Sequence, residues 1–371
     1  PRSPYFTPPR PSLSLPTTHR YHEAKMEWES AGEIYARPQC GNYRKALEHF
    51  LRCGDRALDS AIKVVGSARQ DSLTHMLIDF LNGETDNHVK DAKYIYQLYM
   101  ALGHYSRAAE TATSIAQQEQ VMGEYVKAHE ILFDTCRALL SGSQQVPSDL
   151  RDALSLLHSY TLVKKHKKRG NGKRTAYLLL RVAASVSKFP MHDANLLTAT
   201  VVTCKKMKMH GAAHEWAATL MTHPEMRGKV DPAYGKKLEK VVRKKPKAED
   251  RELPPPHSPC PFCKGSVSEM DLKCTACLNP IPMCIVTGKH MVLDDWSTCP
   301  ACRFPALYTD FRTYLTTPGG PDDDGQCPMC NAHVAVETLV RFDEDDEMLQ
   351  RALRVARGLD PAGEKEEEAD S

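Results

Sequence analysis

The residues with the clearest chemical potential are cysteines spaced as pairs in the last third of the chain. Of 13 cysteines, nine lie between residues 260 and 330, and eight of these form four Cys-x-x-Cys pairs. The pairs are Cys260 with Cys263, Cys274 with Cys277, Cys299 with Cys302, and Cys327 with Cys330. A two-residue gap lets a tight turn direct two thiolates at one ion, and two such turns complete a tetrahedral zinc shell. Four thiolates leave no position for substrate or water, so the pattern indicates structural zinc and not catalysis.

The spacing between the pairs predicts how they combine. Ten residues separate Cys263 from Cys274, enough for one short hairpin, so the first two pairs would form one zinc ribbon. Cys302 and Cys327 have 24 residues between them and would close a second site across a longer loop. The aromatic residues of that loop are Tyr308, Phe311 and Tyr314. We therefore expect two structural zinc ions, on which so small a region depends for folding.

Cys284 and His290 are two further candidate ligands, which do not belong to the four pairs. One interpretation is a third, partial site. Another is a cross-braced arrangement, in which Cys284 and His290 share an ion with Cys327 and Cys330, while the second and third pairs share the other. The alternative without metal is a buried thiol and an ordinary surface or capping imidazole. The spacing leaves these interpretations open.

The remaining four cysteines lie in helical stretches and are interpreted as small core residues. They are Cys40, Cys53, Cys136 and Cys204. No histidine accompanies them in a nucleophile signature, so we predict no catalytic residue and no enzymatic activity.

Length and composition predict about two or three domains of a protein that does not cross a membrane. The 49 basic and 47 acidic residues nearly balance, which does not suggest a nucleic-acid-binding protein overall. No run of 18 apolar residues is present to form a transmembrane segment. The first residues lack the apolar core of a signal peptide, so we place the cysteines in a reducing compartment, where metal binding is favoured over disulfides. Because the chain begins at Pro1, we interpret it as a fragment.

A helical repeat signature stands near the start of the chain. Trp28, Gly32 and Tyr35 are followed by Ala46 and Phe50 at the spacing of a tetratricopeptide (TPR) repeat. In such repeats large side chains fill the groove between two antiparallel helices, and small ones let the helices approach. The motif Gly-x-Tyr-x-Lys/Arg-Ala also recurs, starting at Gly41, Gly103 and Gly123. Glycine suits the left-handed residue that ends a helix. We therefore predict a TPR-like solenoid of helical hairpins, with an ordinary helical bundle as the alternative.

Composition divides the chain into five expected segments. They are a disordered Pro-rich leader (1–20), an α-solenoid (21–250), a Pro-rich linker (251–259), a zinc-binding module (260–340) and an acidic tail (341–371). Two basic runs, at 164–174 and 236–247, suit either an anionic ligand or a solvated surface. We favour a solvated inter-helix loop and a basic linker helix, because aromatic residues do not interleave with either run.

Several stretches together resemble one protein family. They are 284–291 (C-I-V-T-G-K-H-M), 294–296, 299–308 and 327–330 in the cysteine-rich region, and 187–190 and 231–239 in the preceding helices. These resemble the C-terminal tail of the large WD-repeat subunits of intraflagellar transport complex A, from about residue 21 to 340. The WD propellers that begin those proteins have no counterpart here, so we expect a match to the C-terminal third only. The leader and the first basic run also depart from the family pattern.

The resemblance implies a non-catalytic subunit of a ciliary transport assembly. Its partners would be other subunits of intraflagellar transport complex A, with ciliary membrane-protein cargo contacted indirectly and no nucleic acid. It would act in the cilium or flagellum, at the basal body and in the cytoplasm, supporting retrograde transport, cilium assembly and cargo entry. The alternatives are a coat or tethering subunit of vesicle traffic, and a RING-type ubiquitin ligase, which a cross-braced metal arrangement would favour.

Overall fold

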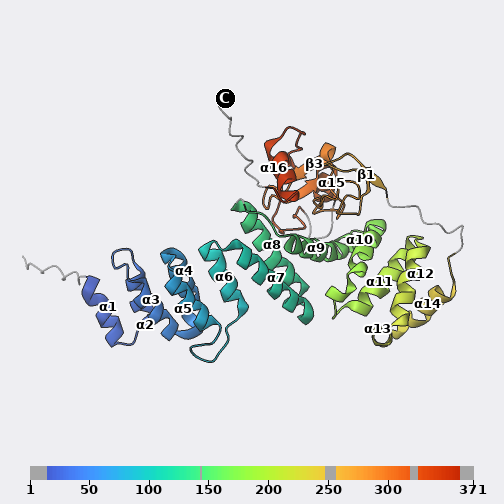
Figure 1. The fold of residues 1–371 in the computed structure, drawn as a ribbon. Coiled ribbons are helices and arrows are strands. Elements are labelled where there is room, and N and C mark those ends of the chain that lie inside the picture. The colour runs from blue at the N-terminus through green and yellow to red at the C-terminus, as the bar shows by residue number, and fades with distance from the viewer. Residues whose placement is uncertain (1–14, 143, 247–255, 318–324, 360–371) are drawn as a thin grey trace, which may run out of the picture. The chain divides into compact units, whose positions relative to one another are not determined.

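The computed structural model describes residues 15–142, 144–246, 256–317 and 325–359. Residues 1–14 of the expected leader, 251–255 of the expected linker and 360–371 of the expected tail lie outside the described residues. The described chain is mostly α-helical, as predicted, with 16 α-helices and two small two-stranded sheets (Figure 1). It divides into two compact units, Pro1–Ala112 and Thr113–Ser371, which are described separately. No helix within the described ranges is long and apolar enough to cross a membrane.

The first unit is a series of short helices. They are α1 (Leu15–Ala24), α2 (Trp28–Ala36), α3 (Tyr43–Arg52), α4 (Leu58–Ala68), α5 (Asp71–Leu81) and α6 (Ala92–Leu102), followed by the first turns of α7 (Tyr105–Met122). α2 packs on α3, α3 on α4 and α4 on α6. Their apolar faces form one core, in which Leu47, Leu58 and Leu77 are fully buried. α1 begins six residues inside the stretch expected to be a disordered leader. Its one proline, Pro16, lies in the first turn, where the missing N–H breaks no intrahelical hydrogen bond.

The predicted TPR signature forms the hairpin of α2 and α3. Gly32 lies against the Phe50 ring so closely that an added Cβ would come within 2.8 Å of it. Tyr35, Ala46 and Phe50 are buried in the same core. Glycine at position 32 is thus explained by the close approach of the two helices, as the sequence predicted.

The recurring glycines take the backbone conformation predicted for them. The φ angles of Gly41, Gly103 and Gly123 are 58°, 75° and 85°. In each case a helix begins at the tyrosine two residues later: α3, α7 and α8 (Tyr125–Ser141). A side chain at any of these glycines would strain the left-handed turn that separates the helices.

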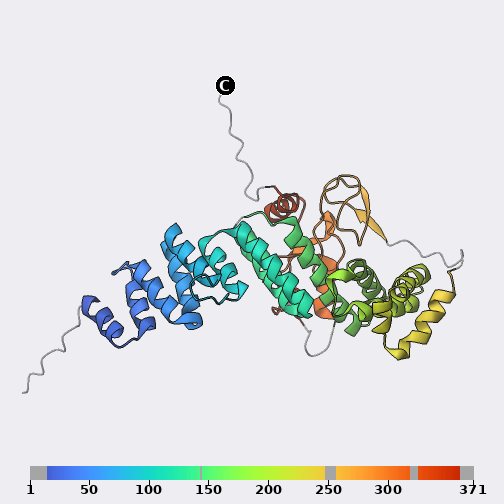
Figure 2. The same cartoon turned by 60° about the horizontal axis from the view of Figure 1, so that its bottom comes forward.

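The second unit combines the later helices with the cysteine-rich region. After the end of α7 come α8, α9 (Ser148–Lys168), α10 (Gly172–Ala184), α11 (Asp193–Lys206), α12 (His210–Thr222), α13 (Pro224–Gly228) and α14 (Pro232–Arg243). Successive long helices pack together, α8 on α9, α9 on α10, α10 on α11 and α11 on α12. The cysteine-rich region lies in the same compact unit as these helices (Figure 2).

The described part of the cysteine-rich region contains two antiparallel hairpins and one α-helix. β1 (His257–Pro259) pairs with β2 (Ser266–Ser268), and β3 (Trp296–Thr298) pairs with β4 (Pro305–Leu307). α15 (Tyr308–Thr316) occupies part of the stretch that was expected to be a long loop. Its Phe311 and Tyr314 are buried, because their spacing of three places both on the inner face of a helix.

Two further segments differ from expectation. α16 (Glu347–Ala356) lies in the segment expected to be a disordered acidic tail, and its Leu349 is fully buried. The prediction for this segment rested on its acidic composition and overlooked the amphipathic pattern of α16. The first basic run is not a solvated loop, since residues 164–168 form the last turn of α9 and Arg169 and Arg174 bind the cysteine-rich region.

Candidate metal centres

The first two cysteine pairs form one sulfur cluster. Cys260 and Cys263 lie in the turn of the β1–β2 hairpin, and Cys274 and Cys277 lie in the turn after it. The Sγ atoms of Cys260 and Cys277 are 3.9 Å apart, those of Cys263 and Cys274 are 3.6 Å apart, and all four lie within 4.8 Å of one another. A tetrahedral zinc ion with bonds of about 2.3 Å separates its sulfurs by about 3.8 Å. The two shorter separations are close to this value, so the four thiolates can surround one zinc ion.

The third and fourth pairs form a second cluster of the same kind. Cys299 and Cys302 lie between β3 and β4, and Cys327 and Cys330 follow α15. The Sγ atoms of Cys302 and Cys327 are 4.0 Å apart, and the four sulfurs again lie within 4.8 Å of one another. The two clusters follow the sequential combination of pairs and not the cross-braced one. The layout that would favour a RING-type ligase is thus not the one found.

Backbone amides favour the thiolate form of one of these cysteines, Cys274. The amides of Ala276 and Cys277 donate to Cys274 Sγ at 3.4 and 3.5 Å. The bond from Cys277 contributes most to lowering the pKa of the Cys274 thiol, to about 6. Because zinc binds the thiolate, a lowered pKa favours the ligand form at neutral pH.

The four knuckles share one backbone pattern with a fifth turn that lacks a second cysteine. In each, the amide of the first cysteine donates to the carbonyl five residues later, and the amide four residues later donates back to the cysteine carbonyl. The first residues are Cys260, Cys274, Cys284, Cys299 and Cys327. The fifth residue of each turn has positive φ, between 57° and 72°: Lys264, Leu278, Gly288, Arg303 and Asn331. Residues 284–288 are therefore a knuckle with threonine at the second ligand position, which we call the fifth knuckle.

The structure places Cys284 and His290 outside both sulfur clusters. Cys284 is fully buried, and its Sγ accepts the Leu307 amide at 3.3 Å. His290 is 1% exposed, so of the surface or capping imidazole given as the alternative without metal, the surface position is excluded. Its Nε2 lies 2.6 Å from Ser258 Oγ and its Nδ1 lies 3.0 Å from the Ser268 carbonyl. His290 thus fastens the β1–β2 hairpin to the fifth knuckle.

Two buried histidines of α9 hold the fifth knuckle. His158 Nε2 donates to the Ile285 carbonyl and His166 Nε2 to the Val286 carbonyl, each at 2.7 Å. Burial lowers the pKa of His158 to about 3 and that of His166 to about 4, so both are neutral at pH 7. The Nδ1 atom of His158 then accepts from His129 Nε2 of α8, at 3.2 Å. Sequence reasoning did not find these histidines, because their carbonyl partners are 120 or more residues away.

Gly288 completes the contact of the fifth knuckle with the helices. A Cβ at this position would lie 2.5 Å from Leu178 Cδ2 of α10, and its φ of 72° is left-handed. Both the close approach and the backbone conformation therefore require glycine. The other four knuckles supply the sulfur ligands of the two metal sites, whereas the fifth knuckle inserts between α9 and α10.

Arginines supply further contacts between the helices and the cysteine-rich region. Arg181 of α10 donates to the Met270 carbonyl and, at 3.2 Å, to Ser159 Oγ. Burial lowers its pKa to about 10. Arg169 donates to the Tyr314 carbonyl at 2.8 Å and lies over that residue's ring.

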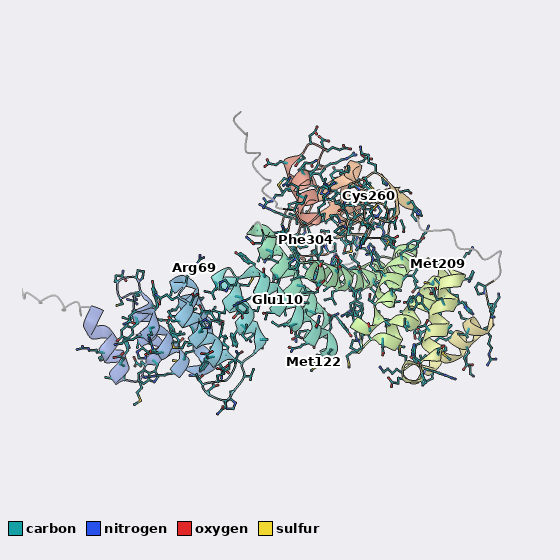
Figure 3. The ribbon with its side chains drawn as sticks, in the orientation of Figure 1. Arg69, Glu110, Met122, Met209, Cys260 and Phe304 are labelled. Atoms are coloured by element: carbon teal, nitrogen blue, oxygen red, sulfur yellow. The ribbon has the colours of Figure 1, made fainter. Side chains whose placement is uncertain are left out.

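An aromatic contact also joins the cysteine-rich region to the helices. Phe304, labelled in Figure 3, packs with its ring centroid 5.3 Å from that of Phe133 in α8.

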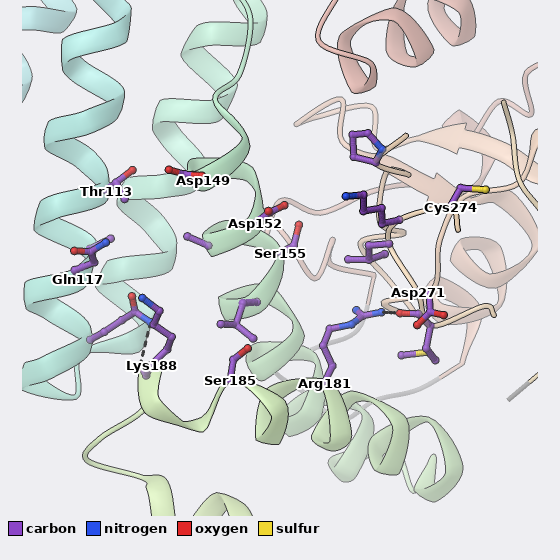
Figure 4. A pocket seen from close by; sticks show the side chains of 18 of the residues that line it. Thr113, Gln117, Asp149, Asp152, Ser155, Arg181, Ser185, Lys188, Asp271 and Cys274 are labelled. Atoms are coloured by element: carbon purple, nitrogen blue, oxygen red, sulfur yellow. Dashed lines mark hydrogen bonds between the residues drawn. The ribbon is translucent and has the colours of Figure 1, made fainter. Parts of the chain in front are cut away.

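A cavity of about 1000 Å³ lies beside Arg181, between the helices and the first zinc ribbon. Figure 4 shows Thr113 and Gln117 of α7, Asp152 of α9 and Asp271 of the ribbon around it. Acidic and basic side chains share its lining, which indicates no preference for one sign of charge.

Comparison with known proteins agrees with this geometry. Residues 282–335 match the family model described as IFT121, second zinc finger domain. Over 334 residues the chain is 42% identical to human WD repeat-containing protein 19, and over 337 residues it is 41% identical to the mouse protein. The human match covers 89% of this chain. The chain resembles the C-terminal part of WD repeat-containing protein 19. It is also 36% identical over 280 residues to WD repeat-containing protein dyf-2 of Caenorhabditis elegans, a match that covers 74% of this chain.

The chain spans 24% of human WD repeat-containing protein 19 and 20% of dyf-2, about a quarter rather than the expected third. The family model begins just before the fifth knuckle and ends just after the second sulfur cluster. It therefore joins the metal-free turn and one four-cysteine site in a single unit. Together, the model and both clusters fit two structural zinc ions, as the cysteine spacing predicted.

Of the four cysteines that were expected in helices, Cys136 and Cys204 lie in α8 and α11, whereas Cys40 and Cys53 lie in turns. Cys136 and Cys204 are buried, as expected of core residues, whereas Cys40 and Cys53 are half-buried. Burial raises the pKa of Cys136 to about 12, which keeps it a thiol at neutral pH.

Proposed function

We propose that this chain is the C-terminal part of a non-catalytic scaffold subunit of intraflagellar transport complex A. The observation that carries the proposal is the 42% identity with WD repeat-containing protein 19 across 89% of the chain. The names of the matched relatives describe no enzyme. Each sulfur cluster offers four thiolates, which fill a tetrahedral shell and leave no site for a substrate.

We propose that the eight paired cysteines are the zinc ligands. We also propose that the cysteine-rich region, which packs against the helices of the second unit, forms the end of the helical scaffold. We propose that the chain's role in the complex is to contact other proteins. These contacts would support retrograde ciliary transport and the entry of membrane-protein cargo. Stacked helices in each unit offer outer faces to neighbouring subunits. On this proposal the protein acts in the cilium, at the basal body and in the surrounding cytoplasm.

The test is affinity purification of the whole tagged protein that contains this chain, from ciliated cells, with the partners identified by mass spectrometry. The proposal predicts recovery of the other subunits of complex A and a ciliary location of the tag. A Cys299→Ser, Cys302→Ser double variant should lose partners, while Arg312→Ala, at an exposed position of α15, should keep them. Recovery of vesicle-coat subunits instead, or ubiquitin transfer by the purified protein, would overturn the proposal.

A further inference from the structure

A second cavity, of about 410 Å³, lies where the second zinc site meets the helices and α16. Its walls come from the end of α8, the start of α9, the β3–β4 hairpin and α16. Leu140, Leu154, Trp296 and Phe304 give it a mainly apolar lining. Its volume falls within the range of about 300–1,000 Å³ typical of small-molecule sites.

The charged groups around this cavity are guanidinium groups and the thiolate of Cys302, a ligand of the second zinc site. Four arginines line it, and no acidic residue is among its described lining residues. They are Arg137, Arg151, Arg303 and Arg351. Arg137 also pairs with Asp134, at 3.0 Å, on the exposed side of α8. An apolar space bordered by guanidinium groups favours a ligand that is apolar along its body and anionic at one end.

Two buried nitrogens of the lining have no hydrogen-bond partner among the described residues. They are Trp296 Nε1 and Arg151 Nε, and Trp296 is fully buried. Arg151 holds α16 through another nitrogen, NH1, which donates to the Ala356 carbonyl at 3.2 Å. Both unpartnered groups are N–H donors, and buried donors are normally satisfied. A carboxylate is the acceptor that suits both an indole N–H and a guanidinium.

We propose that this cavity binds a medium-chain fatty acid. The acyl chain lies against Leu140, Leu154 and Phe304, and the free carboxylate pairs with the guanidinium group of Arg151. The inference does not depend on the proposed transport function, because it rests on the lining alone. An amide-linked acyl group or a neutral chain lacks the anionic end that the arginines select.

Fluorescence of Trp296 in the zinc-loaded 371-residue chain tests this proposal. The chain has three tryptophans, so replacing Trp28 and Trp216 by phenylalanine leaves Trp296 as the only reporter. Laurate, titrated below its micelle concentration, should change the emission with saturation at one molecule per chain. Dodecanol should bind more weakly, and dodecyltrimethylammonium should not saturate. Equal responses to all three probes would mean nonspecific apolar adsorption and would overturn the proposal.

Two variants and one matched control locate the binding. Arg151→Met should weaken laurate binding about tenfold or more, the usual effect of losing a hydrogen bond to a charged group, and leave dodecanol binding nearly unchanged. Arg312→Met, exposed on α15 and outside the lining, is the matched control and should bind laurate as the parent does. Ala352→Phe places a ring in the cavity from α16 and should abolish binding, with zinc content and helix content intact. Undiminished binding by this variant would place the ligand elsewhere and contradict the inference.

Discussion

The fifth knuckle and the knuckle at residues 299–303 have the same backbone but are held in different ways. Both close with the same pair of backbone hydrogen bonds and a left-handed fifth residue. Cys299 and Cys302 belong to a four-sulfur cluster. In the fifth knuckle, Cys284 Sγ accepts a hydrogen bond from a backbone amide, and Thr287 occupies the second ligand position. Two histidines of α9 and the close contact of Gly288 with α10 hold the metal-free turn. The comparison teaches that one turn can serve a metal site or an intramolecular contact, depending on one ligand position.

The largest expected difference between the two turns is in zinc content and folding. Cys299→Ser with Cys302→Ser should lower bound zinc from two ions to one per chain and unfold the second zinc site, because a structural zinc contributes about 10 kcal/mol or more. Cys284→Ser should keep both ions and lower the free energy of unfolding by only about 1–3 kcal/mol. Elemental analysis and chemical denaturation measure these effects. Loss of zinc from Cys284→Ser would place this residue in a metal site.

The close contact of the fifth knuckle predicts the next largest effect. Gly288→Ala should lower the free energy of unfolding of the second unit by about 2–3 kcal/mol more than Gly170→Ala, from overpacking against Leu178. Gly170 is the matched control, since its φ is 73° and nothing lies within 4 Å of an added Cβ. Denaturant titration followed by near-ultraviolet circular dichroism measures the difference. Equal losses in the two variants would mean that only backbone strain matters.

Protonation of the α9 histidines should weaken the fifth knuckle in acid. The folded-state pKa values of about 3 and 4 lie below the unfolded value of about 6.5, so the folded state resists protonation. The stability that these neutral histidines contribute is complete above about pH 6.5 and is lost as the pH falls toward the folded values. For one histidine the loss at pH 5 is about 2 kcal/mol. His166→Gln should flatten the pH dependence of unfolding between pH 6.5 and 5, and an unchanged slope would contradict this explanation.

The sequence predicted what depends on short spacing. The features predicted correctly depend on contacts within a few residues or within one hairpin. They are the cysteine pairs, the glycine that lets α2 approach α3, and the left-handed glycines before α3, α7 and α8. The combination of cysteine pairs into two sites also follows from spacing, because each site is closed by consecutive pairs.

The contacts that join the helices to the zinc sites were not predictable in this way. His158 and Arg181 find partners about 90 to 130 residues away, so no local pattern marks them. Arg169 was assigned to a solvated run because its neighbours are basic, yet it binds the end of α15. α16 was missed because its acidic neighbours outweighed Leu349 and Leu353, which lie four residues apart on one face.

The central claim is that every metal ion in this region is enclosed by sulfur, while the fifth knuckle holds none. Zinc-edge X-ray absorption of the full chain, combined with elemental analysis, tests it most directly. The account predicts two zinc ions per chain, each with four sulfurs at about 2.3 Å. A third ion, or a nitrogen or water ligand at about 2.0–2.1 Å on any ion, would contradict it.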